Sequence, residues 1–253
     1  MCNKQENIFR KRETVKYYLE NLRQIISNYD SSSIYTMDEI LICFDELGRR
    51  NFEIFEDDFE IEENGSRSNC ELTRMLNIVL TTLADGTLLP TLIICHRTSA
   101  FLRIRKHFNI SLNLKEDYLQ LDIDNQSMKK LIWDILKPHS PGKKLLVLRE
   151  THAVNKQALE LLNEIDCELV AIPRGFKDCL HPMDSWTYER PSLKKVFSDY
   201  LKAEWQEWHK KCQSMSSSEE IKFTEQVLID MLSRALLELS NESELIRNVI
   251  LFY

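Results

Sequence analysis

Glycine and proline are scarce in this chain of 253 residues, which contains five and six of them. This scarcity excludes collagen-like and low-complexity disordered proteins. The seven cysteines are odd in number, dispersed and never in a Cys-x-x-Cys or Cys/His ligand spacing. That pattern excludes a disulfide scaffold, argues against a zinc site and fits a reducing compartment. No run approaches the ~18 apolar residues of a membrane span, and the N-terminus lacks an apolar signal core. The sequence predicts a soluble intracellular protein.

The composition is that of an ordinary globular protein, with 43% hydrophobic and 29% charged residues. The 33 Lys and Arg are outnumbered by 40 Asp and Glu, which gives a net charge of -7. A chain of this charge is not an obligatory binder of nucleic acid over its whole surface. Any DNA-binding surface has to be local.

The first third of the chain predicts a helix followed by three antiparallel strands. Apolar residues at spacings of three and four predict a helix that stops near the serines at 31–33. The segment 34–44 is rich in β-forming residues. Two later apolar runs flank Asp85-Gly86, a strong hairpin signal. The acidic insertion 51–69 is most simply a solvated loop.

The middle of the chain alternates helices and strands. It predicts helices over 128–136 and 154–165, and strands over 145–149 and 167–172. Strands separated by helices pair in parallel through crossovers. The expected fold is therefore α/β, an RNase H-like mixed sheet of three antiparallel strands and then parallel ones, flanked by helices.

The last part predicts amphipathic helices over 193–208 and 227–239. Asn241 with Glu244 resembles a capping box that opens a final short helix. We therefore expect a helical lead-in at 1–33, an RNase H-like domain at 34–210, and C-terminal helices at 211–253 packed on that domain.

Several segments together resemble a known family. They read IYTMDEILICFDE, TTLADGTLLPTLIICH, KKLLVLRETH, CELVAIPRGFKDCLHPMDSWTYERPSLKKVF and YLKAEWQEW. In order and spacing these resemble the DDE superfamily endonuclease domain of pogo and Tigger transposases, the group that includes centromere protein B and the jerky proteins. The resemblance runs from about Val15 to the C-terminus.

The resemblance implies a site for two magnesium ions that clamp the attacking and leaving oxygens of a phosphodiester. It makes Asp38 the first acid of the family's triad and Asp184 the third. From the residues alone, Asp38 could equally be an outward-facing strand residue, and Asp184 an acid stabilised by a helix N-terminus. His181 stands where the family has glutamine.

The second acid of the triad should stand at the end of LLVL, where this chain has Arg149. A guanidinium stays protonated and repels the ion that this position should bind. Glu150 is a poor substitute, because neighbouring strand residues point to opposite faces of a sheet. We expect Arg149 to lie between Asp38 and Asp184 and to pair with one or both. The alternative is that Arg149 turns to solvent.

The sequence therefore predicts a transposase-derived, DDE endonuclease-like domain that binds DNA but is catalytically inactive and holds no Mg²⁺. The resemblance implies nuclear residence. The family usually carries helix-turn-helix modules ahead of this domain, whereas residues 1–33 predict about one helix, so DNA binding by this chain is expected to be non-specific. One alternative is a protein-interaction or homodimerising module. Another is an active Mg-dependent nuclease that uses Glu150.

Three basic clusters, at Arg49-Arg50, 103–107 and Lys143-Lys144, are candidates for phosphate contact. The histidines His107, His139 and His152 have no plausible catalytic partner in the sequence.

Overall fold

The computed structural model describes residues 2–45, 52–55, 73–96, 110–115, 125–139, 141–149, 156–173, 176, 180–184, 191–214 and 223–251. Its strands are β1 (Ile34–Asp45), β2 (Phe52–Phe55), β3 (Thr73–Leu83), β4 (Thr91–His96), β5 (Ile110–Lys115), β6 (Lys144–Arg149) and β7 (Cys167–Ile172). Its α-helices are α1 (Cys2–Ile26), α2 (Asn125–Lys130), α3 (Lys137–His139), α5 (Lys156–Glu164), α7 (Leu193–Ser214), α8 (Glu225–Asn241) and α9 (Ser243–Leu251). A short 3-10 turn, η1 (Ser31–Ser33), precedes β1, and a π-helical segment, η4 (Leu131–Leu136), joins α2 to α3.

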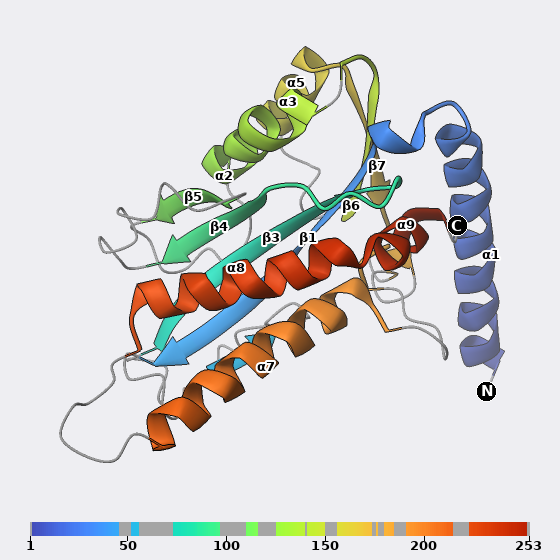
Figure 1. Cartoon of the computed structure of the whole chain (residues 1–253). Helices are drawn as coiled ribbons and strands as arrows, with labels where there is room; N and C mark the ends of the chain where they lie inside the picture. The colour runs from blue at the N-terminus through green and yellow to red at the C-terminus, as the bar shows by residue number, and fades with distance from the viewer. Residues whose placement is uncertain are drawn as a thin grey trace.

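All seven strands form one mixed sheet, in the order β5-β4-β3-β1-β6-β7 with β2 paired to the far end of β1 (Figure 1). The pairs β1–β3 and β3–β4 are antiparallel, whereas β1–β6 and β6–β7 are parallel. Three antiparallel strands followed by parallel ones, with helices on both faces, is the arrangement expected from the sequence. The prediction of an RNase H-like fold is confirmed.

Two strands were not predicted. Residues 52–55 of the acidic insertion form β2, which pairs antiparallel with β1, so the solvated-loop prediction is wrong for this part. The apolar residues of Phe-Glu-Ile-Phe are a short strand signal, and the acidic residues around them favoured a loop instead. In the structure Ile54 packs against the core. Strand β5 pairs parallel with β4 at the sheet edge. The rest of 51–69 lies outside the described residues.

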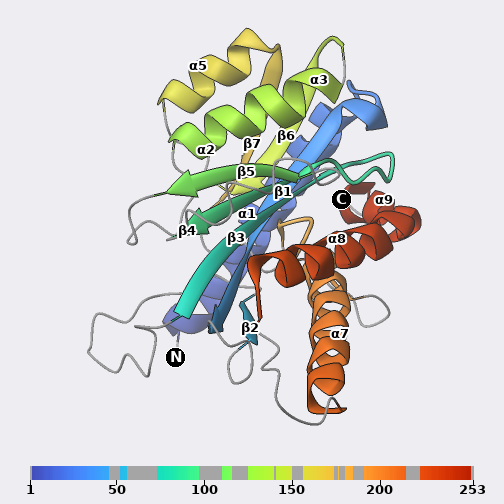
Figure 2. The ribbon, with the colours of Figure 1, turned by 60° about the vertical axis from the view of Figure 1, so that its left-hand side comes forward.

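Helices cover both faces of the sheet (Figures 1 and 2). One face packs against α1, α7, α8 and α9, with Leu22, Phe197 and Leu228 fully buried in that layer. The other packs against α2, η4 and α5, where Leu131 and Leu162 are buried. Among the described residues, no helix is long and apolar enough to cross a membrane.

Strand alternation decides which side chains share a face. Ile40 and Ile42 of β1 face the layer of α7 and α8, so Asp38, two residues earlier, points to the same side. Val147 of β6 faces that layer too, and so does Arg149 two residues later. The sheet therefore directs both side chains toward α7.

The capping box predicted at residue 241 is wrong. Asn241 is the last residue of α8, and α9 begins at Ser243. The apolar repeat of α8 carries that helix up to Asn241, so Asn241 adopts helical rather than capping geometry. A cap does open α8, where the Thr224 hydroxyl accepts a hydrogen bond of 3.3 Å from the backbone N–H of Val227.

Gly86 lies in the β3–β4 turn, where the turn contacts the start of α9. A substitution at Gly86 tests whether this close contact contributes to stability. Its φ is +100°, and an added Cβ would lie 2.5 Å from the carbonyl oxygen of Ser243. We expect Gly86→Ala to lower the free energy of unfolding by at least about 2 kcal/mol, from backbone strain plus this clash. Urea denaturation measures the change.

Gly142 is the matched control for Gly86. Its φ is +97°, but an added Cβ meets nothing within 4 Å. Gly142→Ala therefore carries the backbone strain without the clash. Equal losses of stability in the two variants would show that the contact with Ser243 contributes nothing.

Candidate functional site

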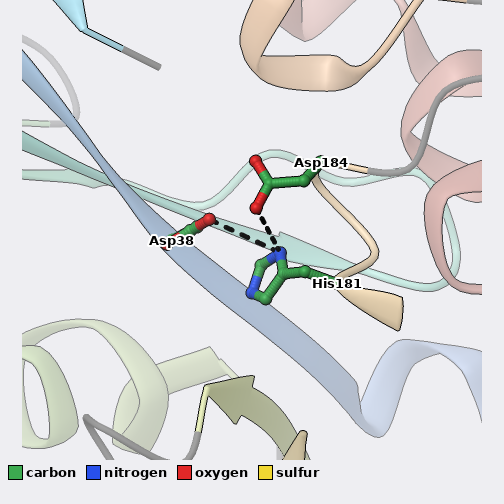
Figure 3. A group of neighbouring side chains, drawn as sticks. All are labelled: Asp38, His181 and Asp184. Atoms are coloured by element: carbon green, nitrogen blue, oxygen red, sulfur yellow. Dashed lines mark ion pairs between the residues drawn. The ribbon is translucent and has the colours of Figure 1, made fainter. Parts of the chain in front are cut away.

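Two aspartates and a histidine converge between the sheet and α7. Asp38 comes from β1, and His181 and Asp184 come from the segment 180–184 before α7 (Figure 3). The His181 Nδ1 atom lies 3.5 Å from Asp38 Oδ2 and 3.8 Å from Asp184 Oδ2. The side chains of Asp38 and His181 are fully buried, and that of Asp184 is 9% exposed. The structure thus brings together the two acids that the resemblance singled out.

Arg149 pairs with Asp38 inside this cluster. Thr36 and Val147 are register partners of β1 and β6, and two residues further along each strand stand Asp38 and Arg149. The Nη2 atom of Arg149 donates to Asp38 Oδ1, and the arginine side chain is only 8% exposed. The expected pairing with Asp38 is observed, and the alternative in which Arg149 turns to solvent is wrong.

A second cation, which sequence reasoning missed, enters the cluster from the first turn of α7. The ammonium of Lys194 contacts Asp38 Oδ2 and lies 2.7 Å from Asp184 Oδ1. Its side chain is 1% exposed. The helical spacing of Lys194 with the buried Phe197 and Leu201 already placed it on the inward face of the helix. That was the available signal.

His181 is held by its own loop. The backbone N–H of Met183 donates to the Nδ1 atom of His181 over 3.2 Å, so the lone pair of this nitrogen is engaged within the loop. The same segment is tied to α7, because the N–H of Lys194 lies 3.5 Å from the carbonyl oxygen of Met183. These contacts fix the ring beside Asp38 and Asp184.

In the cluster the carboxylates of Asp38 and Asp184 face the cations of Arg149 and Lys194. Burial alone would raise the pKa of the Asp38 carboxyl. The neighbouring His181, Lys194 and Arg149 outweigh burial and hold that pKa well below its ordinary value. Burial alone would also lower the pKa of Lys194, but the two aspartates raise it above its ordinary value. Both groups are therefore ionised at neutral pH.

A magnesium ion does not fit this arrangement. Asp38, His181 and Asp184 offer ligand atoms within 4.8 Å of one another. However, Asp38 already binds Arg149 and Lys194, and Asp184 binds Lys194. Magnesium requires several anionic or neutral oxygens at about 2.1 Å, and two fixed cations at that place repel it. The side chains present make a buried ion-pair cluster rather than an open metal site.

The two lysines of the Lys143-Lys144 cluster make contacts within the protein. The ammonium of Lys143 lies 3.3 Å from a carboxylate oxygen of Glu168 and 5.0 Å from the centre of the Tyr29 ring. Lys144 is buried, and its ammonium donates to the carbonyl oxygens of Gly142 and Ile165. Both ammonium groups are therefore engaged within the protein.

The other candidate residues divide into two groups. Outside the described residues lie Glu150, His107, His152, Arg49-Arg50 and 103–107. Within the described part, His139 is exposed at the end of α3. Trp205 and Trp208 of α7 are partly buried against the core; Trp208 meets Phe223 edge-on at 4.9 Å, and Trp205 stacks on His209 of the same helix at 5.2 Å.

No protein-family model matches the chain. No curated protein matches it either. Among solved structures, it is similar to a Mos1 transposase paired-end complex with left transposon end, at 12% identity and a TM-score of 0.38, over 92% of this chain and 60% of that one. It is also similar to a pre-cleavage Mos1 transpososome, at 13% identity and a TM-score of 0.35, over 93% of this chain and 61% of that one. The chain thus spans about three fifths of the length of the transposase chains that it resembles.

Proposed function

We propose that this chain is a transposase-derived, DDE endonuclease-like domain of the pogo and Tigger type that binds DNA and does not cut it. One observation carries the loss of cutting. At the strand end where the resemblance places the second acid, Arg149 instead forms a buried ion pair with Asp38, the first acid. In this proposal Asp38 and Asp184 are former metal ligands that now hold the fold together.

Phosphodiester cleavage by two metal ions needs carboxylates whose oxygens are free to bind the ions. Both oxygens of Asp38 are engaged here, one by Arg149 and the other by Lys194. Opening the site for metal would leave two buried cations without their counter-charge, which is costly in a water-excluded layer. The ion pairs of the folded protein therefore oppose the metal binding that catalysis requires.

DNA is the partner that the family resemblance favours. Two of the solved structures to which the chain is similar are described as a transposase complex with a transposon end and a transpososome. With a net charge of -7, contact with phosphates requires a local basic surface and depends strongly on salt. Binding through phosphates alone does not depend on the DNA sequence. A DNA-binding role is consistent with the nuclear location that the resemblance implies.

Cutting and binding are tested separately. We expect supercoiled plasmid incubated with the protein and Mg²⁺ to be nicked no faster than plasmid alone. We expect fluorescence anisotropy of a labelled duplex to show binding that weakens about tenfold or more between 50 and 200 mM salt. Nicking that needs metal and disappears in both Asp38→Ala and Asp184→Ala would contradict the loss of catalysis and favour a live nuclease.

A protein-interaction module is the second candidate. The net charge of -7 and the engagement of Lys143 and Lys144 within the protein favour it. A chain that fails to bind duplex DNA at low salt, and that sediments as a dimer, would select this candidate over DNA binding. Sedimentation of the same sample used for anisotropy makes the comparison direct.

A further inference from the structure

The helical run from α2 through η4 to α3 carries positive charge on its outer face. Its apolar residues, such as Leu131, are buried against the sheet. Lys129 and Lys137 are exposed, and Trp133, midway between them, is half-buried. The run contains three lysines and one acid, Asp134, in a chain whose net charge is -7. It is therefore a local basic surface on an acidic protein.

We infer that the face formed by Lys129, Trp133 and Lys137 binds the phosphate backbone of duplex DNA. The inference rests on the proposed function, in that it takes DNA as the partner. It adds where the DNA lies, on the side of the sheet opposite α7 and the cluster around Asp38 (Figures 1 and 2). The sheet then separates the bound DNA from the two aspartates, which accords with binding without cutting.

The spacing of the three residues places them in one row. They are four residues apart, and the π-helical segment η4 takes more residues per turn than an α-helix does, so they stay nearly in line. At the α-helical rise, Lys129 and Lys137 are separated by roughly 12 Å along the helix axis. One strand of DNA carries a phosphate about every 3.4 Å along its axis, so the row spans about three phosphates. Both ammonium groups can therefore contact the same strand.

The two outer lysines have no acidic partner to give up. Neither Lys129 nor Lys137 pairs with an acid among the described residues, and the acid of this run, Asp134, lies 4.0 Å from Lys130 instead. By contrast, the ammonium of Lys194 is enclosed by two buried carboxylates. A phosphate that meets Lys129 and Lys137 therefore displaces only solvent and small counterions.

The indole of Trp133 holds one of these ammonium groups in position. The Nζ atom of Lys137 lies 3.6 Å from the centre of the Trp133 ring. A cation is attracted to the face of an indole and keeps its charge there. A side chain that is already restrained loses less conformational freedom when it contacts a ligand. The contact thus favours phosphate binding by Lys137.

The neighbouring helix α5 marks the edge of the basic surface. On α5, Lys156 pairs with Glu160 at 3.9 Å, and Glu164 is exposed. This helix therefore adds no positive charge to the row. A search of the sequence for adjacent basic residues misses the row, because its outer charges are eight positions apart in the chain and share a face only in the helix.

The experiment measures binding of a labelled duplex by fluorescence anisotropy in 50 mM salt. We expect Lys129→Glu/Lys137→Glu to bind at least about tenfold more weakly than the wild-type chain, because two attractive phosphate contacts become repulsive. In Lys129→Ala/Lys137→Ala, the slope of log affinity against log salt concentration should become shallower by about two, one for each lost contact.

The matched control is Lys202→Glu/Lys210→Glu, which makes the same change of net charge on α7, in the opposite layer. Because charges distant from the DNA are screened by salt, this control should weaken binding by less than about threefold. Circular dichroism checks that each variant is folded.

The inference is overturned if Lys129→Glu/Lys137→Glu binds as tightly as the wild-type chain, or if the control on α7 weakens binding as much. In both cases DNA binding stands and only its place on the molecule is wrong. A wild-type chain that binds no duplex in 50 mM salt overturns the inference together with the DNA-binding part of the proposed function. The two kinds of failure are therefore distinct.

Discussion

Replacing Asp38 by alanine is expected to lower the free energy of unfolding by about 3–5 kcal/mol, because it removes the carboxylate partner of the buried Arg149 and one of the two carboxylate partners of the buried Lys194. Arg149 and Lys194 both contact this one carboxylate, and their side chains are 8% and 1% exposed. A domain is typically stable by only about 5–15 kcal/mol, so a loss of this size removes a large share of the total. Urea denaturation followed by circular dichroism gives the value.

Asp199→Ala is the matched control for this prediction. Asp199 also pairs with a lysine of α7, Lys195, but both side chains are about half exposed, at 55% and 46%. A solvent-exposed pair of this kind contributes well under 1 kcal/mol. Similar losses in Asp38→Ala and Asp199→Ala would mean that the buried cluster has no special role in stability.

Acid is expected to unfold the protein chiefly through the same carboxylate. Burial would raise the pKa of Asp38, but its cationic neighbours hold the pKa well below the ordinary value of 3.8. A carboxyl whose pKa is lower in the folded state stabilises the fold fully above its unfolded pKa. That contribution is lost as the pH falls from about 4 toward the folded pKa. Below pH 4 the free energy of unfolding should therefore fall by up to about 1.4 kcal/mol per pH unit from this one group.

The comparison that isolates this effect is the slope of stability against pH in Asp38→Asn, which cannot titrate. We expect a shallower slope than in the wild-type chain between about pH 4 and pH 2. Glu168→Gln serves as the control. A hydrogen bond from Tyr29 lowers the pKa of Glu168 too, but that carboxylate is 43% exposed, so its slope should barely change. An unchanged slope in Asp38→Asn would refute the assignment to Asp38.

Much of the fold follows from local pattern. The hairpin at Asp85-Gly86, the helical stripes and the strands around 145–149 and 167–172 are all signals that act over a few residues, and the structure confirms them. The mixed sheet then follows from connection rules. Strand β2 escaped prediction because its four residues are stabilised by pairing with β1, a contact that acidic neighbours in the sequence do not reveal.

The candidate site was only half predictable. The family resemblance placed Asp38 and Arg149 at one site, and a charge argument predicted that Arg149 would pair with Asp38, Asp184 or both. Lys194 was missed because adjacent lysines at the start of an amphipathic helix usually point to solvent, and Lys195 does so. The spacing of Lys194 with Phe197 and Leu201 was the local signal that distinguished Lys194 from Lys195.

Strand β1 has hydrogen-bonded neighbours on both sides. It pairs with β3 along nearly its whole length on one side, and with β6 and β2 at its two ends on the other. Backbone held in this way opens only when the sheet as a whole comes apart, rather than in the small excursions that exposed loops and frayed helix ends undergo. Asp38 lies between these two ends and pairs with Leu80 of β3, and we therefore expect its backbone to open slowly. Slow opening would hold the carboxylate beside Arg149 and Lys194 during small local motions of the chain.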